Sequence, residues 1–299
     1  MASFRAQQSV NQRKTWMLLG SMFSLVAFVV YAVGLYFGQV GFSIVPIAVV
    51  IALVSVWGSY WASDKIVLTM TGAKVITEED HPQLYNLVQE IVIASGLPMP
   101  KIAIVNDAAP NAFATGRDPE RGVIAFTTGL LEKMDREQIQ GVVAHELAHV
   151  ANRDTLVSAV AATTAGALAL MSDLLIRMMW FGGNRQRNSG SNPLALVAAL
   201  VALILAPIAA TLLRSAISRR REALADATAI AYTRNPAGLR RALETLAEDS
   251  TVVNQKSTAV AHVWIESPLD ARSTAKLFAT HPPIEERIAL LRKMENGQL

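Results

Sequence analysis

The residues best suited to chemistry are His145, Glu146 and His149, two histidines and a glutamate in one short stretch. On a helix, side chains four residues apart stand about 6 Å from each other on one face. Two imidazoles so placed can bind one Zn²⁺, each through a bond of about 2.0–2.1 Å. Glu146 lies beside the metal, where a carboxylate can take a proton from a water that the metal activates. The alternative is two buried core histidines, but two of five histidines flanking one glutamate disfavour it.

The stretch around these residues is typical of a helix. Asp135 with Gln138 three residues later predicts a capping box at its start. Apolar residues then recur at helical spacing: Ile139, Val142, Val143, Leu147 and Val150. The sequence therefore predicts that a helix carries the two histidines.

A catalytic zinc site usually has three protein ligands, so one ligand is still missing. The best candidate is Glu222, with Asp226 one helical turn further on the same face. Glu222 can bind the metal, while Asp226 can accept an N–H from a ligating histidine and fix its tautomer. The alternative is a solvated acidic face beside the basic run Arg219–Arg221. Because the chain has no cysteine, thiolate ligands and disulfides are excluded.

The composition points to a membrane protein. Hydrophobic residues make up 52% of the chain and charged residues 17%, and the mean hydropathy is +0.32. The net charge is +3, but the basic residues gather beside apolar runs. We therefore interpret them as topology signals and expect no nucleic-acid partner.

Two uncharged apolar runs, Thr15–Gly38 and Gly41–Ser63, predict an antiparallel transmembrane hairpin. The turn between them has no positive charge, whereas Arg13, Lys14 and Lys65 lie on the opposite side. The excess of basic residues predicts that the N-terminus and everything after Lys65 are cytoplasmic.

A second apolar pair follows the histidine helix. Its clearest part, Pro193–Leu213, has about the 20 residues that a bilayer requires. We favour a membrane hairpin over a buried helical pair, and both alternatives stay open. The expected parts of the chain are an N-terminal hairpin (1–64), a catalytic half with a small sheet (65–154), the second apolar hairpin (155–214) and a C-terminal helical half (215–299).

The expected fold class is mainly α with a small β-sheet. A helix is predicted from Pro82 to Gly96, and another over Ile284–Met294. Three strands are predicted, over Lys101–Val105, Ala112–Thr115 and Gly122–Thr127, followed by a short helix or turn over Gly129–Met134. An exposed edge of such a sheet can add an extended peptide as a further strand.

These motifs resemble the HtpX family of membrane-embedded zinc metalloproteases, of the gluzincin type, over essentially the whole length. The resemblance implies an integral-membrane, zincin-like fold with one Zn²⁺ per chain on His145, His149 and Glu222. It also implies that Asn111, Ala112, Phe113 and Ala114 hold the peptide substrate. The expected activity is endopeptidase cleavage of misfolded or damaged membrane proteins, at the bacterial inner membrane with the active site facing the cytoplasm. No oligomeric state is implied.

The resemblance gives His281 two possible roles. It can hydrogen-bond the oxyanion of the reaction, or it can turn the chain into the last helix together with Pro282 and Pro283. Two rival functions remain, a non-catalytic membrane scaffold with a structural metal and a hydrolase of a non-peptide substrate.

Overall fold

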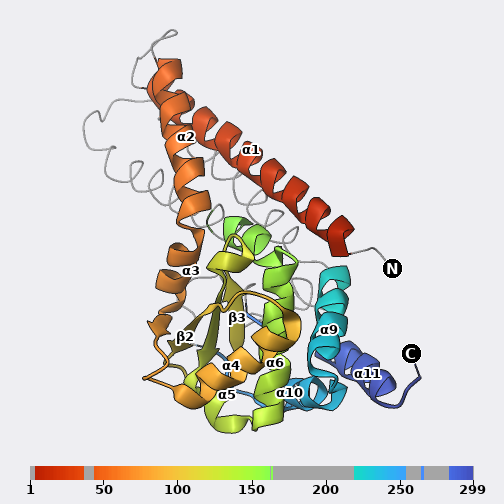
Figure 1. Ribbon diagram of the computed structural model, residues 1–299. Coiled ribbons are helices and arrows are strands. Elements are labelled where there is room, and N and C mark those ends of the chain that lie inside the picture. Colours follow the sequence, from red (N-terminus) through yellow and green to blue (C-terminus); the bar gives the residue numbers. More distant parts are fainter. Residues whose placement is uncertain are drawn as a thin grey trace, which may run out of the picture.

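A computed structural model of the chain describes residues 4–36, 44–161, 163, 219–253, 264–265 and 283–298. The fold is mainly helical with one small mixed sheet, as expected. Figure 1 shows two long helices, α1 (Phe4–Tyr36) and α2 (Ile44–Trp61), extending from a body that contains the sheet and the remaining helices. The expected second apolar hairpin, from residue 164 onward, and His281 lie outside the described residues.

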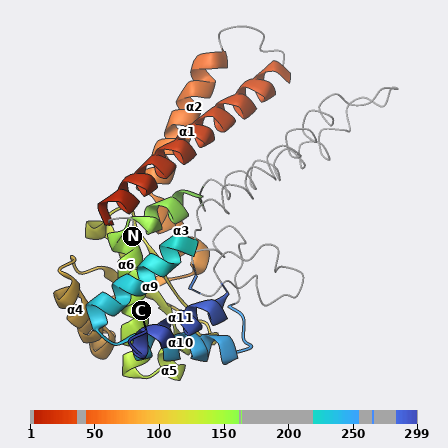
Figure 2. The same cartoon turned by 90° about the vertical axis from the view of Figure 1, so that its right-hand side faces the viewer.

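Helices α1 and α2 lie side by side in both views (Figures 1 and 2). Large apolar side chains on this pair point outward, and Trp16 and Trp57 are 72% and 68% exposed. Among the described helices, none on its own meets the length and hydropathy needed for a membrane span; Val45–Gly58 and Ser63–Thr71 meet them jointly, with a 69° bend between them. The second helix also ends earlier than expected, because α3 (Ser63–Thr71) begins as a separate helix.

The sheet has the strand order β1-β2-β4-β3. Strands β2 (Lys101–Val105) and β4 (Val123–Thr127) are parallel, and the outer strands β1 (Lys74–Ile76) and β3 (Ala112–Thr115) are antiparallel to their neighbours. The three predicted strands are confirmed. Strand β1 was not predicted, because three residues are too few for a visible alternation.

Both faces of the sheet are covered by apolar residues. On one face Ile102, Ile124 and Phe126 pack into the main core, to which α4 (Pro82–Ser95) and the histidine helix contribute. On the other face Ala103 and Val123 pack with residues of α3. Alternate residues thus face two apolar layers, which explains why β4 is buried at every position.

The histidine helix is α6 (Arg136–Ala151), and its predicted capping box is confirmed. Asp135 accepts a hydrogen bond from the Gln138 backbone, while the Gln138 side chain accepts one from the Asp135 backbone. Helix α6 lies against α10 (Pro236–Glu248) at Gly141, where a Cβ would come within 2.6 Å of the Leu239 backbone nitrogen. A glycine there allows the close approach that fixes the position of α6.

The remaining described elements complete the body. The C-terminal part packs into the same core as the sheet, so the stretches before and after residues 164–218 fold together. The helices predicted over Pro82–Gly96 and Ile284–Met294 are confirmed within one residue of their expected bounds, whereas α10 was not predicted. The elements are a short 3-10 turn (Pro119–Arg121), α5 (Thr128–Lys133), α9 (Arg219–Thr233) and α11 (Ile284–Glu295).

Candidate metal centre

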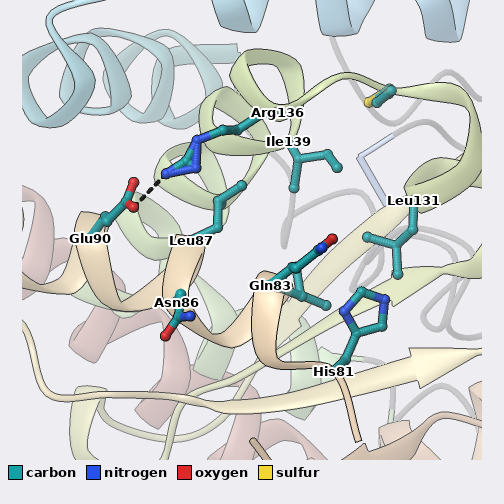
Figure 3. A pocket seen from close by; sticks show the side chains of 10 residues that line it. His81, Gln83, Asn86, Leu87, Glu90, Leu131, Arg136 and Ile139 are labelled. Atoms are coloured by element: carbon teal, nitrogen blue, oxygen red, sulfur yellow. Dashed lines mark hydrogen bonds and ion pairs between the residues drawn. The ribbon is translucent and has the colours of Figure 1, made fainter.

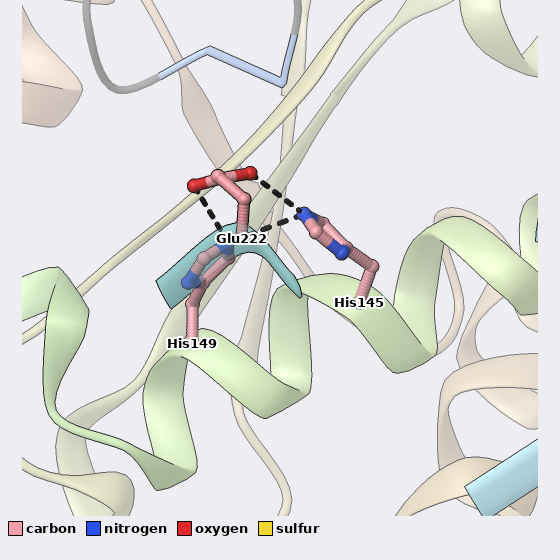
Figure 4. A group of neighbouring side chains, drawn as sticks. All are labelled: His145, His149 and Glu222. Carbon is pink, nitrogen blue, oxygen red and sulfur yellow. Dashed lines mark hydrogen bonds and ion pairs between the residues drawn. The ribbon is translucent and has the colours of Figure 1, made fainter. Parts of the chain in front are cut away.

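The structure brings His145, His149 and Glu222 together (Figure 4). The two imidazoles project from one face of α6, and Glu222 reaches them from the first turn of α9. The two Nε2 atoms are 3.1 Å apart. The Glu222 oxygens lie 3.7 Å from Nε2 of His145 and 3.6 Å from Nε2 of His149. Glu222 is only 5% exposed, which excludes the solvated acidic face.

The donor atoms fit a tetrahedral metal ion. Bonds of about 2.0–2.2 Å to such an ion place neighbouring donor atoms about 3.3–3.6 Å apart. The two nitrogens are 3.1 Å apart, and each lies 3.6 or 3.7 Å from a different oxygen of Glu222, close to this range. Two imidazoles and one carboxylate are also the donor set of many catalytic zinc sites, which leave one coordination position for water or substrate. The group therefore has the geometry and chemistry of a catalytic metal centre.

Asp226 lies on the other side of the His145 ring. Its Oδ1 is 2.9 Å from Nδ1 of His145, and because an ionised carboxylate only accepts, Nδ1 is the donor. The Nε2 lone pair is then directed at the metal position. Arg287, from α11, holds Asp226 through two hydrogen bonds of 2.9 and 2.6 Å. Asp226 therefore lies where the sequence analysis expected it.

The charges around His145 keep it neutral. Burial and the positive charge of Arg287 lower the pKa of His145 to about 4, against the opposing effect of Asp226. Burial opposes ionisation of Asp226, but Arg287 and the hydrogen bond from His145 outweigh it and lower its pKa to about 2. At neutral pH the pair is thus a neutral imidazole and a carboxylate, as metal binding requires.

His149 has a different partner, Asp154, whose Oδ2 lies 3.1 Å from Nδ1 of the ring. Burial disfavours the charged ring, but Glu222 and the hydrogen bond to Asp154 outweigh it and raise the pKa of His149 to about 9. The Nδ1–H bond again leaves Nε2 directed at Glu222. Sequence reasoning missed Asp154, although it lies only five residues beyond His149.

Glu146 is buried, with 3% of its surface exposed. It is not a member of the metal-binding group, which agrees with a carboxylate placed beside the metal. Its charge acts on both His149 and Arg287. Arg287 was also missed as a site residue, although it lies in the predicted helix Ile284–Met294. The sequence signal for Arg287 would be a charged residue on the same helical face as the apolar Leu291, four positions later.

The strand expected to hold the substrate, β3, has its outer edge paired with other residues of the chain. Residues Asn111, Ala112, Phe113 and Ala114 are buried, so the edge is not exposed. Phe113 forms a β-bridge with Trp264, and the Ile265 N–H donates to the Ala112 carbonyl at 2.9 Å. The Trp264 ring also packs against Phe113, with ring centroids 4.8 Å apart. This edge is covered because residues far along the chain pair with it, which a local pattern does not indicate.

A cavity of about 510 Å³ lies elsewhere, between α4 and residues of α5 and α6 (Figure 3). Its lining includes His81, Asn86 and Leu131 but none of the metal-binding residues. The Arg136 guanidinium is paired with Glu90 at its rim. Histidine 81 thus belongs to a different region from the metal centre.

The fold and the His-His-Glu group define a metallopeptidase. The model of Peptidase family M48 matches residues 78–295, and the chain belongs to this family. It is a metalloprotease, and the family resemblance read from the sequence is confirmed by its relatives.

The chain is 43% identical over 293 residues to a "Protease HtpX homolog" of Streptococcus gordonii, covering 96% of this chain and 99% of that one. It is 47% identical over 283 residues to a protein of the same description from Syntrophobacter fumaroxidans, covering 94% and 98%. The crystal structure of S. mikatae Ste24p is similar in fold, with a TM-score of 0.51 at 16% identity, and covers 95% of this chain and 66% of that one.

Proposed function

We propose that this metalloprotease is a zinc-dependent endopeptidase that acts at the bacterial inner membrane. The observation that carries the proposal is the convergence of His145, His149 and Glu222, with each imidazole held at Nδ1 by a buried carboxylate. Such outer partners orient the ligand atoms and raise the basicity of the rings. A structural metal would need a fourth protein ligand, and the metal-binding group in the described residues has three.

The proposed mechanism assigns each residue one task. His145, His149 and Glu222 would hold the zinc ion, which when bound would lower the pKa of a water towards about 7 and supply a Lewis acid for the scissile carbonyl. The Glu146 carboxylate accepts the proton of the attacking water and then delivers it to the nitrogen of the leaving amine. Asp226 and Asp154 hold the rings of His145 and His149 in the tautomer that directs Nε2 at the metal. His281 remains a proposed donor to the oxyanion.

The proposed substrates are polypeptides, bound in extended form along β3 and Asn111. A peptide that pairs with this edge takes the position of Trp264 and Ile265, because both residues already contact the strand. A structure of the Glu146→Gln variant with a bound peptide tests this placement. A peptide lying away from β3 would contradict it.

A membrane location is supported by the apolar surface of the helical hairpin. Large side chains are exposed along α2, including Ile47, Val50, Leu53 and Val54. A contiguous apolar surface of this kind is unusual on a soluble monomer and marks contact with lipid or protein. We further propose that the hairpin spans the bilayer, with the metal centre on the cytoplasmic side, and that misfolded membrane proteins are the substrates.

The deciding experiment compares the purified full-length protein with its Glu146→Gln variant. An unfolded polypeptide is incubated with each, with and without a chelator, and zinc content is measured in parallel. We expect the wild type to cleave only with its metal, and the variant to keep one zinc but lose at least about 100-fold in rate, because it lacks the base. The isosteric change keeps the shape of the site.

The other outcomes separate the alternatives. Cleavage by the zinc-loaded variant at the wild-type rate would remove Glu146 from the mechanism. Zinc binding without cleavage in the wild type would favour a scaffold or a hydrolase of another substrate. Loss of zinc from the His145→Ala and Glu222→Ala variants, but not from the Glu146→Gln variant, is expected if the ligand set is correct.

A further inference from the structure

Asn11 is a fully buried amide on α1, the helix expected to lie in the membrane. Its Nδ2 donates one hydrogen bond to Oδ1 of Asp154 at 2.6 Å and one to the Asn152 carbonyl at 2.9 Å. An amide nitrogen has two protons, so both are used. Asn11 and Asp154 lie 143 positions apart in the chain. The amide thus ties α1 to the segment that follows the histidine helix.

The same carboxylate contacts the metal centre through its other oxygen. Oδ2 of Asp154 lies 3.1 Å from Nδ1 of His149, and Asp154 itself is only 3% exposed. A continuous line of hydrogen bonds therefore runs from Asn11 through Asp154 to a metal-binding imidazole. Because Asn11 and Asp154 are buried, water cannot easily replace the hydrogen bond between them, and the His149 side chain is itself only 15% exposed.

The hydrogen bonds from Asn11 also hold the backbone turn that precedes Asp154. Helix α6 ends at Ala151 with Asn152 as its C-cap, and Arg153 adopts a left-handed conformation with φ of 58°, which a non-glycine residue occupies at a cost. Asp154 begins the next helical stretch. Asn11 contacts the residue before and the residue after Arg153, so it fixes the turn that aims Asp154 at His149.

We propose that Asn11 is a positioning residue for the metal centre, because its amide on α1 holds the Asp154 carboxylate that orients His149. The proposal rests on the proposed function of His145, His149 and Glu222 as a metal site. Asn11 would act through Asp154: without its amide, the carboxylate loses a hydrogen-bond donor and the turn loses its anchor. His149 would then lose the fixed orientation on which metal affinity depends.

Simple docking of α1 is the competing explanation, and the chain offers a matched control for it. Leu18 and Leu19 of α1 are buried against Leu156 and Val157, in an apolar cluster next to Asp154. These leucines hold α1 without contacting the metal ligands. A Leu19→Ala variant therefore weakens docking but leaves the Asn11–Asp154–His149 line in place.

The test measures binding of Zn²⁺ and Co²⁺ to the detergent-solubilised full chain. Zinc affinity is obtained by competition with a chromophoric chelator, and the visible absorption of bound Co²⁺ reports the geometry of its ligands. We expect Asn11→Ala to weaken zinc binding about tenfold or more and to alter the Co²⁺ spectrum. Leu19→Ala should lower the unfolding temperature with an unchanged spectrum and affinity. Asn11→Leu, which keeps the branched skeleton of four side-chain heavy atoms, is the second variant if truncation prevents folding.

A double-mutant cycle sharpens the result. Combining Asn11→Ala with Asp154→Asn should weaken zinc binding by less than the product of the two single effects, since both act on His149. Wild-type affinity and spectrum in both Asn11 variants would overturn the proposal, and so would equal effects of Asn11→Ala and Leu19→Ala on affinity. Failure of the wild type to bind either metal would instead refute the proposed function of the site.

Discussion

The two histidines of the metal centre are alike in position on α6 and different in their support. His145 is held by Asp226, which is itself paired bidentately with Arg287 from the last described helix. His149 is held by Asp154, whose second oxygen takes a neutral amide proton from Asn11 of the first helix. One helix thus presents two ligands that are oriented from opposite ends of the chain. The supports of the two ligands therefore come from segments near both ends of the chain.

The electrical surroundings of the two rings also differ. Asp226, the carboxylate that holds His145, is paired with the positive charge of Arg287. Burial and the charge of Arg287 lower the pKa of His145 to about 4. Around His149, burial is outweighed by two carboxylates, Glu222 and Asp154, and the pKa rises to about 9. Residues of one type, one helical turn apart, thus hold a proton in different pH ranges. This difference between the two histidines can be tested by substituting the carboxylates, by changing the pH and by substituting the arginines.

The largest effect is expected from comparing Asp226→Asn with Asp154→Asn. Both changes keep the size of the side chain and remove its charge. Asp226→Asn leaves Arg287 buried beside an uncharged partner, so it should cost about 3–5 kcal/mol of stability and about 100-fold in zinc affinity. Asp154→Asn disrupts a bond to a neutral amide and should cost about 1–3 kcal/mol and about tenfold. Thermal unfolding of the metal-free proteins and zinc competition give both numbers.

Equal losses in the two variants would show that the arginine makes no difference to how firmly a ligand is held. The surface substitution Glu90→Gln serves as control, because its ion pair with Arg136 is exposed and such pairs contribute about 0–1 kcal/mol.

The next effect is a pH dependence of zinc binding that comes from His149 alone. Its pKa is raised to about 9, so below that pH a proton must leave before the ring can bind metal. Zinc affinity should therefore rise about tenfold per pH unit from about pH 6.5 to 9 and then level off. His145, with a pKa of about 4, adds no dependence in this range. Competition titrations across the range measure the slope, and levelling off already near pH 7 would contradict it.

The metal-free protein should show the opposite trend. A folded pKa above the ordinary value of 6.5 means that protonated His149 stabilises the fold below pH 6.5. This contribution is lost as pH rises through about 9. Zinc should therefore raise the free energy of unfolding most at high pH, where the metal-free protein has lost the contribution of protonated His149.

Local patterns pointed to the ligands and to one supporting carboxylate, Asp226, but not to Asp154, Arg287 or Asn11. The His145–His149 spacing, the Asp135 cap and the strands are written in neighbouring residues, and the structure has the cap and strands where they were predicted. Asp226 could be expected because it stands one turn from Glu222. Arg287 reaches His145 across a separation of 142 residues, and Asn11 reaches Asp154 across 143. Contacts of this kind arise only when distant segments pack together, so no periodicity reveals them.

The covered edge of β3 was missed for the same reason. Trp264 lies in a stretch without sustained periodicity, yet it is fully buried against Phe113. A strand can therefore be predicted from its local sequence although the residues that pair with its edge cannot. The sequence identified the strand but not the residues that pair with its edge.

The smallest effect is expected at the arginine on the His149 side. Arg221 is buried like Arg287, but its guanidinium lies 3.5 Å from Oδ1 of Asp154, at the limit of a hydrogen bond. Replacing a weakly paired buried cation by an apolar side chain of similar length removes little attraction and also removes a desolvation cost. Arg221→Met should therefore change zinc affinity less than about threefold, measured by the same competition assay. Arg287→Met, which leaves Asp226 without its bidentate partner, should reduce it at least about tenfold. If the two arginines proved equally important, His149 would depend on a charge as His145 does, and the distinction between an ion-paired and an amide-supported ligand would be wrong.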